Sequence, residues 1–364
     1  MRALLASAGL LVLAGSAVAG RPTAHTLRKS VAGPIAAVAQ DSGTAAWFTS
    51  NTHGACNEVH ILSPGKHDRM LPQPSAGSST CNWVLAGWQP QLALAARMST
   101  ALWTLHESGP APFDSVVAAS IGGHEQMIDH LAHASDGTGK WLGGVAGAGR
   151  ILAYSWNDVE YVNPEKCLSG GSCKQKVADG GIKIVTRTAT QLDTTQLPGA
   201  GPALQLAASA GRIAYVPATT VKAGRPSTSA KNVLQIVDAV TGATDGQALV
   251  HGFPIAIALS PRVLAVLTTE GTVHDRISWF SAANGTKLDS VVVSGLAAPQ
   301  LAVSDRLIVY RVGRLLRDVT TSTGRVGRLV KTGLNEVGLS LAHGRLVWAE
   351  NHNGAGRLRA LALG

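Results

Sequence analysis

The chain has 364 residues, of which 45% are hydrophobic and only 15% are charged, and its formal net charge at pH 7 is +9. This composition excludes a disordered chain, and after the N-terminus no apolar run approaches the ~18 residues that a membrane-spanning helix requires. The 41 glycines and the recurring turn signals favour an all-β fold of many short strands.

The N-terminus has the three regions of a secretory signal peptide. Arg2 supplies an early positive charge, an apolar run extends to Leu13, and Ala17, Val18 and Ala19 form a cleavage site of the A-x-A type. We therefore expect residues 1–19 to be removed. Residues 20–364 would then form one secreted domain, extracellular or on the cell-envelope side, without a transmembrane segment.

Groups of short runs with alternating apolar residues recur along the rest of the chain. Each complete group has four runs, here called strands a, b, c and d, within about 40–50 residues, which is typical of one β-propeller blade. Helical repeats of this length would need apolar spacings of three and four. The pattern predicts a seven-bladed propeller, with six or eight blades as alternatives. The groups cover 35–73, 83–122 and 141–197, and later ones begin near Ala203, Ile255, Pro299 and Val337.

The last group is one strand short. Its three runs, "VGLSLAH", "RLVWAEN" and "RLRALAL", would leave the outer edge of that blade unpaired. Propellers commonly avoid such an edge by closing the ring. The segment 24–31 ("AHTLRKSV") is therefore predicted to supply the missing outer strand.

Three segments in the C-terminal half share one pattern. In each, a Gly-containing turn connects an apolar strand to a polar strand. The segments are "LQIVDAVTGATDGQ" (234–247), "ISWFSAANGTKLDS" (277–290) and "LLRDVTTSTGRVGR" (315–328). Within them "VDAVTG" and "SAANG" are similar to a D-x-x-T-G turn, so the chain resembles the secreted bacterial β-propellers of the TolB-like, YVTN-type and quinoprotein-like group. The resemblance implies a propeller fold. Because Thr244, Leu288 and Val326 occupy the region where the quinoprotein pattern has Trp, we expect no bound quinone. No other cofactor is predicted.

The long connections are predicted to lie on one face of the propeller. In a blade the b–c and d–a connections emerge together, opposite the a–b and c–d turns. Long loops on a rigid scaffold are where such proteins bind ligands, and simple tolerance of insertions at exposed tips is the alternative reading. The long connections of the b–c or d–a type are 51–56, 74–82, 122–140, 157–180 and 218–231.

The chain contains four cysteines, Cys56, Cys81, Cys167 and Cys173. An even number in an exported protein predicts two disulfides, for which three pairings are possible. We predict a disulfide between Cys56 and Cys81, because both are expected on the same rim of the propeller. We predict a second disulfide between Cys167 and Cys173, because they bracket a short stretch of one insertion. No C-x₂-C pair supports a metal site built from these thiols.

The segment "HEQMIDHLAH" (124–133) contains three candidate ligand-binding residues, His124, His130 and His133. Imidazole with carboxylate groups would suit zinc or copper. However, the H-E-x-x-H spacing fails because Ile128 stands where the second His belongs. We interpret the segment as a solvated polar loop and predict no metal.

The insertion of the third group supplies the remaining candidate residues. Trp156 and Tyr161 offer flat apolar contact area, and Asn157, Asp158 and Glu160 offer hydrogen-bonding groups. No G-x-S-x-G elbow is present and the carboxylates are scattered, so no catalytic residue is predicted. The favoured function is a non-catalytic module that binds a protein, peptide or glycan through the long-loop face of blades 2–4. The alternative is an extracellular propeller enzyme, a metal-assisted or metal-free polysaccharide lyase or hydrolase.

The positive charge gives a weaker indication about partners. A basic patch near the C-terminus would attract polyanions weakly, but no nucleic-acid-binding motif accompanies it. We interpret it as solvated charge on outer strands, which favour Lys and Arg. The cluster comprises Arg311, Arg314, Arg317, Arg325 and Arg328.

Overall fold

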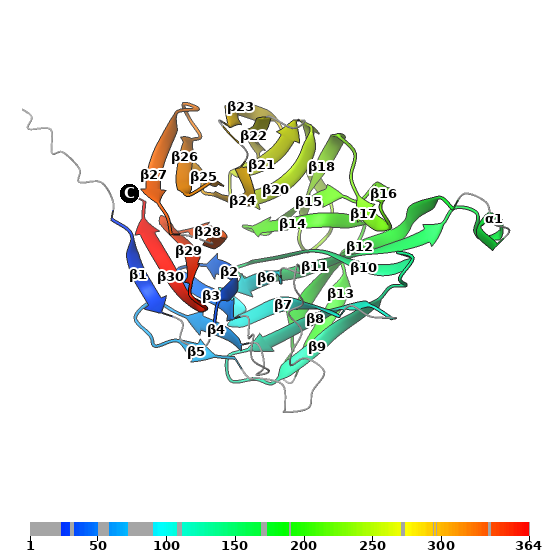
Figure 1. The fold of residues 1–364 in the computed structure, drawn as a ribbon, viewed down its shortest axis with the longest axis horizontal. Coiled ribbons are helices and arrows are strands. Elements are labelled where there is room, and N and C mark those ends of the chain that lie inside the picture. The colour runs from blue at the N-terminus through cyan, green and yellow to red at the C-terminus, as the bar shows by residue number, and fades with distance from the viewer. Residues whose placement is uncertain are drawn as a thin grey trace, which may run out of the picture.

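The protein is a seven-bladed β-propeller. Its computed structural model is nearly all β, with seven sheets of four antiparallel strands arranged in a ring (Figure 1). The predicted fold class and the preferred blade number are therefore confirmed. The structure describes residues 23–29, 33–49, 58–71, 90–107, 111–168, 173–188, 191–270, 274–293, 295, 297–333 and 336–363.

The first four blades follow the chain from the innermost strand outward. Blade 1 comprises β2 (Ile35–Asp41), β3 (Thr44–Thr49), β4 (Glu58–Leu62) and β5 (Arg69–Met70). Blade 2 comprises β6 (Leu92–Ala95), β7 (Thr100–Glu107), β8 (Phe113–Ser120) and β9 (Glu125–Ala132), with a 3-10 turn η1 (Ala96–Met98). Blade 3 comprises β10 (Gly139–Ala148), β11 (Ile151–Tyr161), β12 (Gln175–Arg187) and β13 (Leu192–Gln196). Blade 4 comprises β14 (Ala203–Ser209), β15 (Arg212–Pro217), β18 (Lys231–Asp238) and β19 (Thr244–His251).

The last three blades repeat this order, and the insertions add three small elements. Blade 5 comprises β20 (Phe253–Leu259), β21 (Val263–Glu270), β22 (His274–Ser281) and β23 (Lys287–Val293). Blade 6 comprises β24 (Ala297–Val303), β25 (Leu307–Val312), β26 (Leu315–Thr320) and β27 (Val326–Lys331). Blade 7 comprises β28 (Glu336–Ala342), β29 (Arg345–His352), β30 (Ala355–Ala362) and β1 (His25–Lys29). The insertions contain α1 (Pro164–Leu168) and a hairpin of β16 (Thr220–Lys222) and β17 (Arg225–Ser227).

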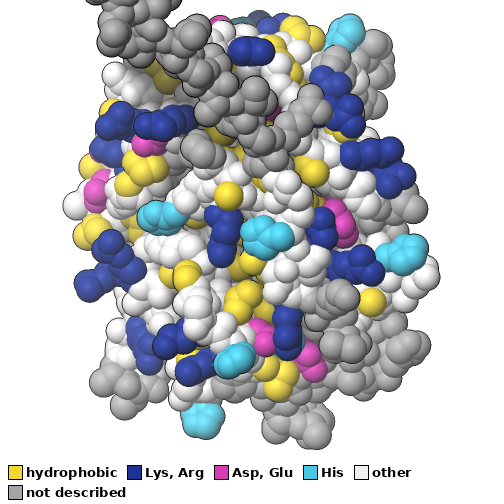
Figure 2. Space-filling model, turned by 90° about the vertical axis from the view of Figure 1, so that its left-hand side faces the viewer, with side chains coloured by type: hydrophobic (Ala, Val, Ile, Leu, Met, Phe, Trp, Pro, Cys, Tyr) yellow, Lys and Arg dark blue, Asp and Glu magenta, His cyan; other side chains and the backbone are white. Residues whose placement is uncertain are grey.

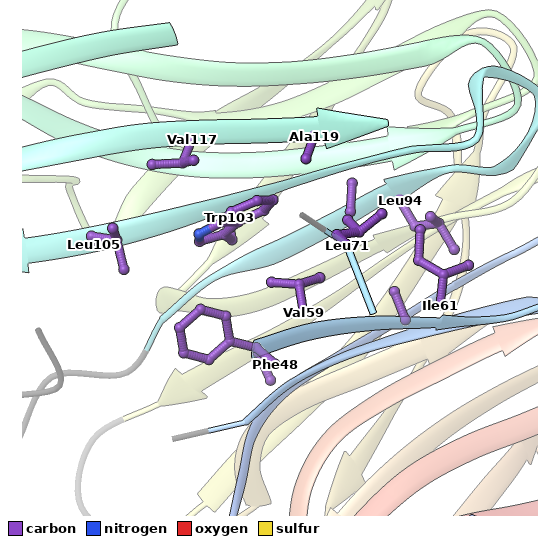
Figure 3. Packing of buried hydrophobic residues seen from close by; sticks show 12 residues of the cluster. Phe48, Val59, Ile61, Leu71, Leu94, Trp103, Leu105, Val117 and Ala119 are labelled. Carbon is purple, nitrogen blue, oxygen red and sulfur yellow. The ribbon is translucent and has the colours of Figure 1, made fainter. Parts of the chain in front are cut away.

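The hydrophobic core lies between the blades. Because each blade is covered on both faces by its neighbours, a middle strand such as β8 is apolar along most of its length and buried from Asp114 to Ser120. Between blades 1 and 2, Phe48 and Val59 face Trp103 and Val117 (Figure 3). Packing of each sheet against the sheets of the neighbouring blades therefore explains both the alternating and the continuous apolar runs of the sequence.

The N-terminal strand closes the ring as predicted. β1 pairs with β30, with His25 opposite Ala360 and Arg28 opposite Leu358, and lies beside it in Figure 1. Leu27 packs against the cluster shared by blades 7 and 1. Blade 7 therefore gains its fourth strand from the other end of the chain.

The predicted bounds of blade 2, 83–122, are displaced by one strand. The innermost strand β6 begins only at Leu92, the outermost strand β9 ends at Ala132, and residues 83–89 lie outside the described residues. The expected loop 122–140 contains the outer strand β9. Its polar sequence reflects an outer position, where one edge and much of the surface face water.

Within the part of the chain that the structure describes, no helix has the length and apolar character needed to cross a membrane.

Candidate functional site

Three segments of the b–c and d–a type meet on one rim of blades 2, 3 and 4. They are the turn 134–138 that follows β9, the far end of the β11–β12 hairpin, and the β16–β17 hairpin. Tyr161 donates its hydroxyl to Oδ2 of Asp136 at 2.9 Å, and the Gln175 amide donates to the Asp136 carbonyl at 2.9 Å. Blades 2 and 3 are thus joined at this rim.

The insertion 157–180 is an extension of the blade rather than an irregular loop. β11 and β12 remain paired as far as Tyr161 opposite Gln175, and α1 follows at the tip. In Figure 1 this hairpin projects away from the ring. Continued pairing satisfies backbone groups of 157–161 and 175–180 and fixes the positions of the side chains that these strands carry.

Two glycines allow blades 2 and 4 to touch across blade 3. A Cβ atom on Gly137 would lie 2.3 Å from the carbonyl oxygen of Gly224, and both glycines have positive φ. Only glycine can make this approach without moving the backbone. The turn 134–138 therefore lies directly against the tip of the β16–β17 hairpin.

These segments enclose a cleft of about 440 Å³, here called the rim cleft. Blade 2 supplies the histidines, blade 3 the indole and amide, and blade 4 the guanidinium. The lining residues are His106, Pro112, His133, Ala134, Ser135, Asp136, Gly137, Trp141, Gln175, Ala223, Gly224 and Arg225.

One wall of the rim cleft is a stack of flat side chains. The rings of His106 and His133 are nearly parallel, with centroids 5.9 Å apart, and those of His133 and Trp141 are 3.8 Å apart. The Arg225 guanidinium lies 5.5 Å from the Trp141 ring on the same cleft, a cation–π contact. The Trp141 indole donates to the Gly137 carbonyl at 2.9 Å, which fixes the orientation of its ring.

A possible set of metal ligands lies behind this wall. His106, Asp114 and His133 each offer one possible ligand atom, and these three atoms lie within 4.8 Å of one another. Asp114 is 6% exposed; its Oδ1 is 2.7 Å from Nδ1 of His106, and its Oδ2 accepts the Leu142 amide at 3.1 Å. Two imidazoles with one carboxylate are a common donor set for zinc and other transition metals.

His133 has an unusual environment for a polar side chain. It is only 7% exposed, and both of its ring nitrogens are buried without a hydrogen-bond partner among the residues that the structure describes. Burial lowers the pKa of His133 below 6.5; Asp114 opposes this shift, and His106 and Arg225 reinforce it. Burial thus favours the neutral ring, which has an available lone pair.

The predicted residues of the blade 3 insertion divide between surface and core. Tyr161 borders the rim cleft through Asp136, and its hydrogen bond to that carboxylate is the main cause that raises the pKa of Tyr161. Trp156 lies further along β11, where its indole contacts Gln196 and the Lys140 ammonium lies 5.4 Å from its ring.

Asn157 differs from its neighbours. It is fully buried, and its amide donates to the Ala203 carbonyl of blade 4, so it joins two blades and leaves no surface for a ligand. Asp158 is half-buried opposite Lys140, and Glu160 is exposed opposite Lys176.

The three predicted histidines do not form one site. His124 lies in the c–d turn after β8, on the opposite face of the propeller, and His130 is exposed on β9 with its ring 4.2 Å from that of Phe113. Only His133 reaches the rim cleft. Sequence reasoning missed its partners, although His106 and Asp114 are direct neighbours in the pairing of β7 with β8.

The disulfide predictions remain predictions. Cys56 and Cys81 lie outside the described residues. Cys167 and Cys173 are thiols in this structure, and the hydrogen bond between them is the main cause that raises the pKa of Cys167 to about 11. Their proximity is compatible with the predicted pair.

A larger cavity of about 570 Å³ lies at the opposite end of the propeller, between the a–b turns of the inner strands. Two of its carboxylates, Asp41 and Asp305, accept hydrogen bonds that join blades. Asp41 Oδ2 accepts the amides of Ala96 and Gly149, both at 2.7 Å, and Asp305 Oδ1 accepts from Ser260 and from the Arg262 amide. This cavity is larger than the rim cleft, but the rim cleft is the one lined by a buried histidine whose ring nitrogens have no partner among the described residues.

The basic residues of blade 6 are partly neutralised. Arg311 forms an ion pair of 2.5 Å with Glu336, and Arg314 donates to the carbonyls of Thr332 and Gly333. Figure 2 shows the side of the molecule that is at the left in Figure 1. Lys and Arg are dispersed across it among other side chains rather than gathered in one patch.

The comparisons with known proteins show the fold alone. No protein-family model and no curated protein matches the sequence. A chain of the mitotic checkpoint complex is 12% identical over 100% of this chain and 99% of its own, with a TM-score of 0.54. The AfRom2 CNH domain is 12% identical over 94% and 100%, with a TM-score of 0.48. Apo AztD from Citrobacter koseri is 12% identical over 82% and 72%, with a TM-score of 0.45. The resemblance to the TolB-like group stays a prediction.

Proposed function

We propose that the protein is a binding module whose ligand occupies the rim cleft of blades 2–4, without catalysis. The observation that carries this proposal is the construction of the cleft, in which segments of three blades are held together by Gly137, Gly224 and the Tyr161–Asp136 bond. A fixed concave site with a few polar groups is what ligand binding requires.

The chemistry of the cleft favours a peptide with an acidic group. His133 covers the Trp141 ring at 3.8 Å and Arg225 lies near the same ring, so little of that ring is free to stack on a sugar. Among the described residues Arg225 has no ion pair, and its exposed guanidinium can donate two parallel hydrogen bonds to a carboxylate. Ser135 and Gln175 also line the cleft and add polar side chains to it.

The test begins with peptides selected from a display library against the purified protein. Arg225→Ala and Tyr161→Ala should each weaken binding of a selected peptide by about 1–3 kcal/mol, measured by calorimetry, because anchor residues carry most of the affinity. The matched control is Arg262→Ala, since Arg262 is an exposed arginine in a turn of the opposite face. Equal losses from Arg225→Ala and Arg262→Ala, or capture of glycans but no peptides, would contradict the proposal.

A further inference from the structure

We propose that His106, Asp114 and His133 bind one divalent transition-metal ion, with zinc as the best match, at the inner wall of the rim cleft. This inference is independent of peptide binding, because the three residues form a complete set of protein ligands by themselves.

The first argument is the position of the donor atoms. A zinc ion bound to nitrogen or oxygen at about 2.0–2.2 Å holds its ligand atoms roughly 3–3.5 Å apart. The three donors lie within 4.8 Å of one another, and Nδ1 of His106 is already 2.7 Å from Oδ1 of Asp114. Small side-chain movements are therefore enough to surround an ion, with no change in the strands that carry the ligands.

The second argument is the free-energy cost of burying the unpartnered ring nitrogens of His133. Burying an unpartnered polar atom costs about 1–3 kcal/mol, and proteins rarely keep such an atom without a purpose. His133 has two, although it is enclosed by Asp114, His106 and Trp141. A metal ion would give one of these nitrogens a strong partner.

The third argument concerns charge and orientation. The Asp114 carboxylate compensates part of the charge of a divalent cation, and the Leu142 amide holds its other oxygen in place. Hydrogen bonds of this kind commonly orient metal ligands. Because His106 and His133 both line the rim cleft, a fourth coordination position can face the cleft and accept water or a ligand group.

The decisive experiment is a zinc titration of tag-free protein that has been stripped with EDTA, followed by calorimetry. We expect one equivalent of zinc per chain, and weakening by about 100-fold or more in His133→Ala and in Asp114→Asn, since even the partners of metal ligands change affinity by about 10–100-fold. Asp114→Asn keeps the shape of the side chain and covers the case in which His133→Ala fails to fold. Circular dichroism verifies the fold of each variant.

Two controls make the result specific. His130→Ala removes an exposed histidine of β9 and should leave zinc affinity unchanged. The double variant Cys167→Ser, Cys173→Ser should also retain the site, and the cobalt form should lack thiolate absorption. No zinc bound by folded wild type, equal affinity in wild type and Asp114→Asn, or loss only in the cysteine variant would overturn the inference. Peptide capture repeated in EDTA reports on the proposed function separately.

Discussion

Asp238 shows how single side chains define the repeated turns. Its Oδ1 accepts the amides of Val240 and Thr241 at 3.0 and 2.8 Å, and the Thr241 hydroxyl at 2.9 Å. Gly242 then adopts a φ of 72°, which L side chains rarely adopt. The D-x-x-T-G pattern therefore stabilises the turn between strands c and d, and it does not by itself indicate a ligand.

This turn makes a prediction about acid stability. The hydrogen bond from the Thr241 amide is the main cause that lowers the pKa of Asp238 below 3.8. A carboxyl with a lowered folded-state pKa stabilises the protein above its ordinary pKa, and this contribution is lost as the pH falls through the folded value. Asp238→Ala should reduce the free energy of unfolding by about 1 kcal/mol at pH 7.

The difference between wild type and Asp238→Ala should shrink as the pH is lowered below 3.8, in urea unfolding curves recorded from pH 7 to 3. A difference that stays constant over this range would show that the ionised carboxylate is not what holds the turn.

At the scale of elements, the rim cleft depends on the contact between two turns. A Cβ on Gly137 would meet the Gly224 carbonyl at 2.3 Å, whereas a Cβ on Gly122 would have nothing within 4 Å, and both residues have positive φ. The two substitutions to Ala therefore carry similar backbone strain but differ in the clash.

We expect Gly137→Ala to lower the free energy of unfolding by about 1–3 kcal/mol more than Gly122→Ala, which is the usual cost of overpacking. Chemical denaturation measures both values. Equal losses would mean that the two turns are not packed against each other, and the cleft would lose its blade 4 wall.

The elements also show what the sequence can and cannot predict. Alternating runs predict strands, and the short last blade predicts closure by β1, because an unpaired edge is unfavourable. The predicted bounds of blade 2 are displaced by one strand because β9 is an outer strand. Most of its side chains are partly or fully exposed to water, so its sequence is polar and lacks the apolar pattern that predicts a strand. The histidine cluster was missed because its members come from β7, β8 and the turn after β9, and only their pairing brings them together.

At the scale of the whole molecule, the two ends of the propeller have different roles. The a–b end contains the larger cavity, but its carboxylates Asp41 and Asp305 accept hydrogen bonds from backbone amides of other blades. These bonds hold the ring together. At the rim cleft, by contrast, the two ring nitrogens of His133 are buried and have no hydrogen-bond partner among the described residues. The a–b end therefore holds the blades together, and the rim cleft holds the side chains that we propose bind a ligand.

Hydrogen–deuterium exchange with and without a bound peptide, read over the whole chain, tests most directly whether the rim cleft is the binding site. We predict slower exchange in 131–141 and 220–227, which form the cleft, and no change in the turns 259–263 and 303–307 at the opposite end. Protection centred on the opposite end, with the rim segments unchanged, would contradict the account.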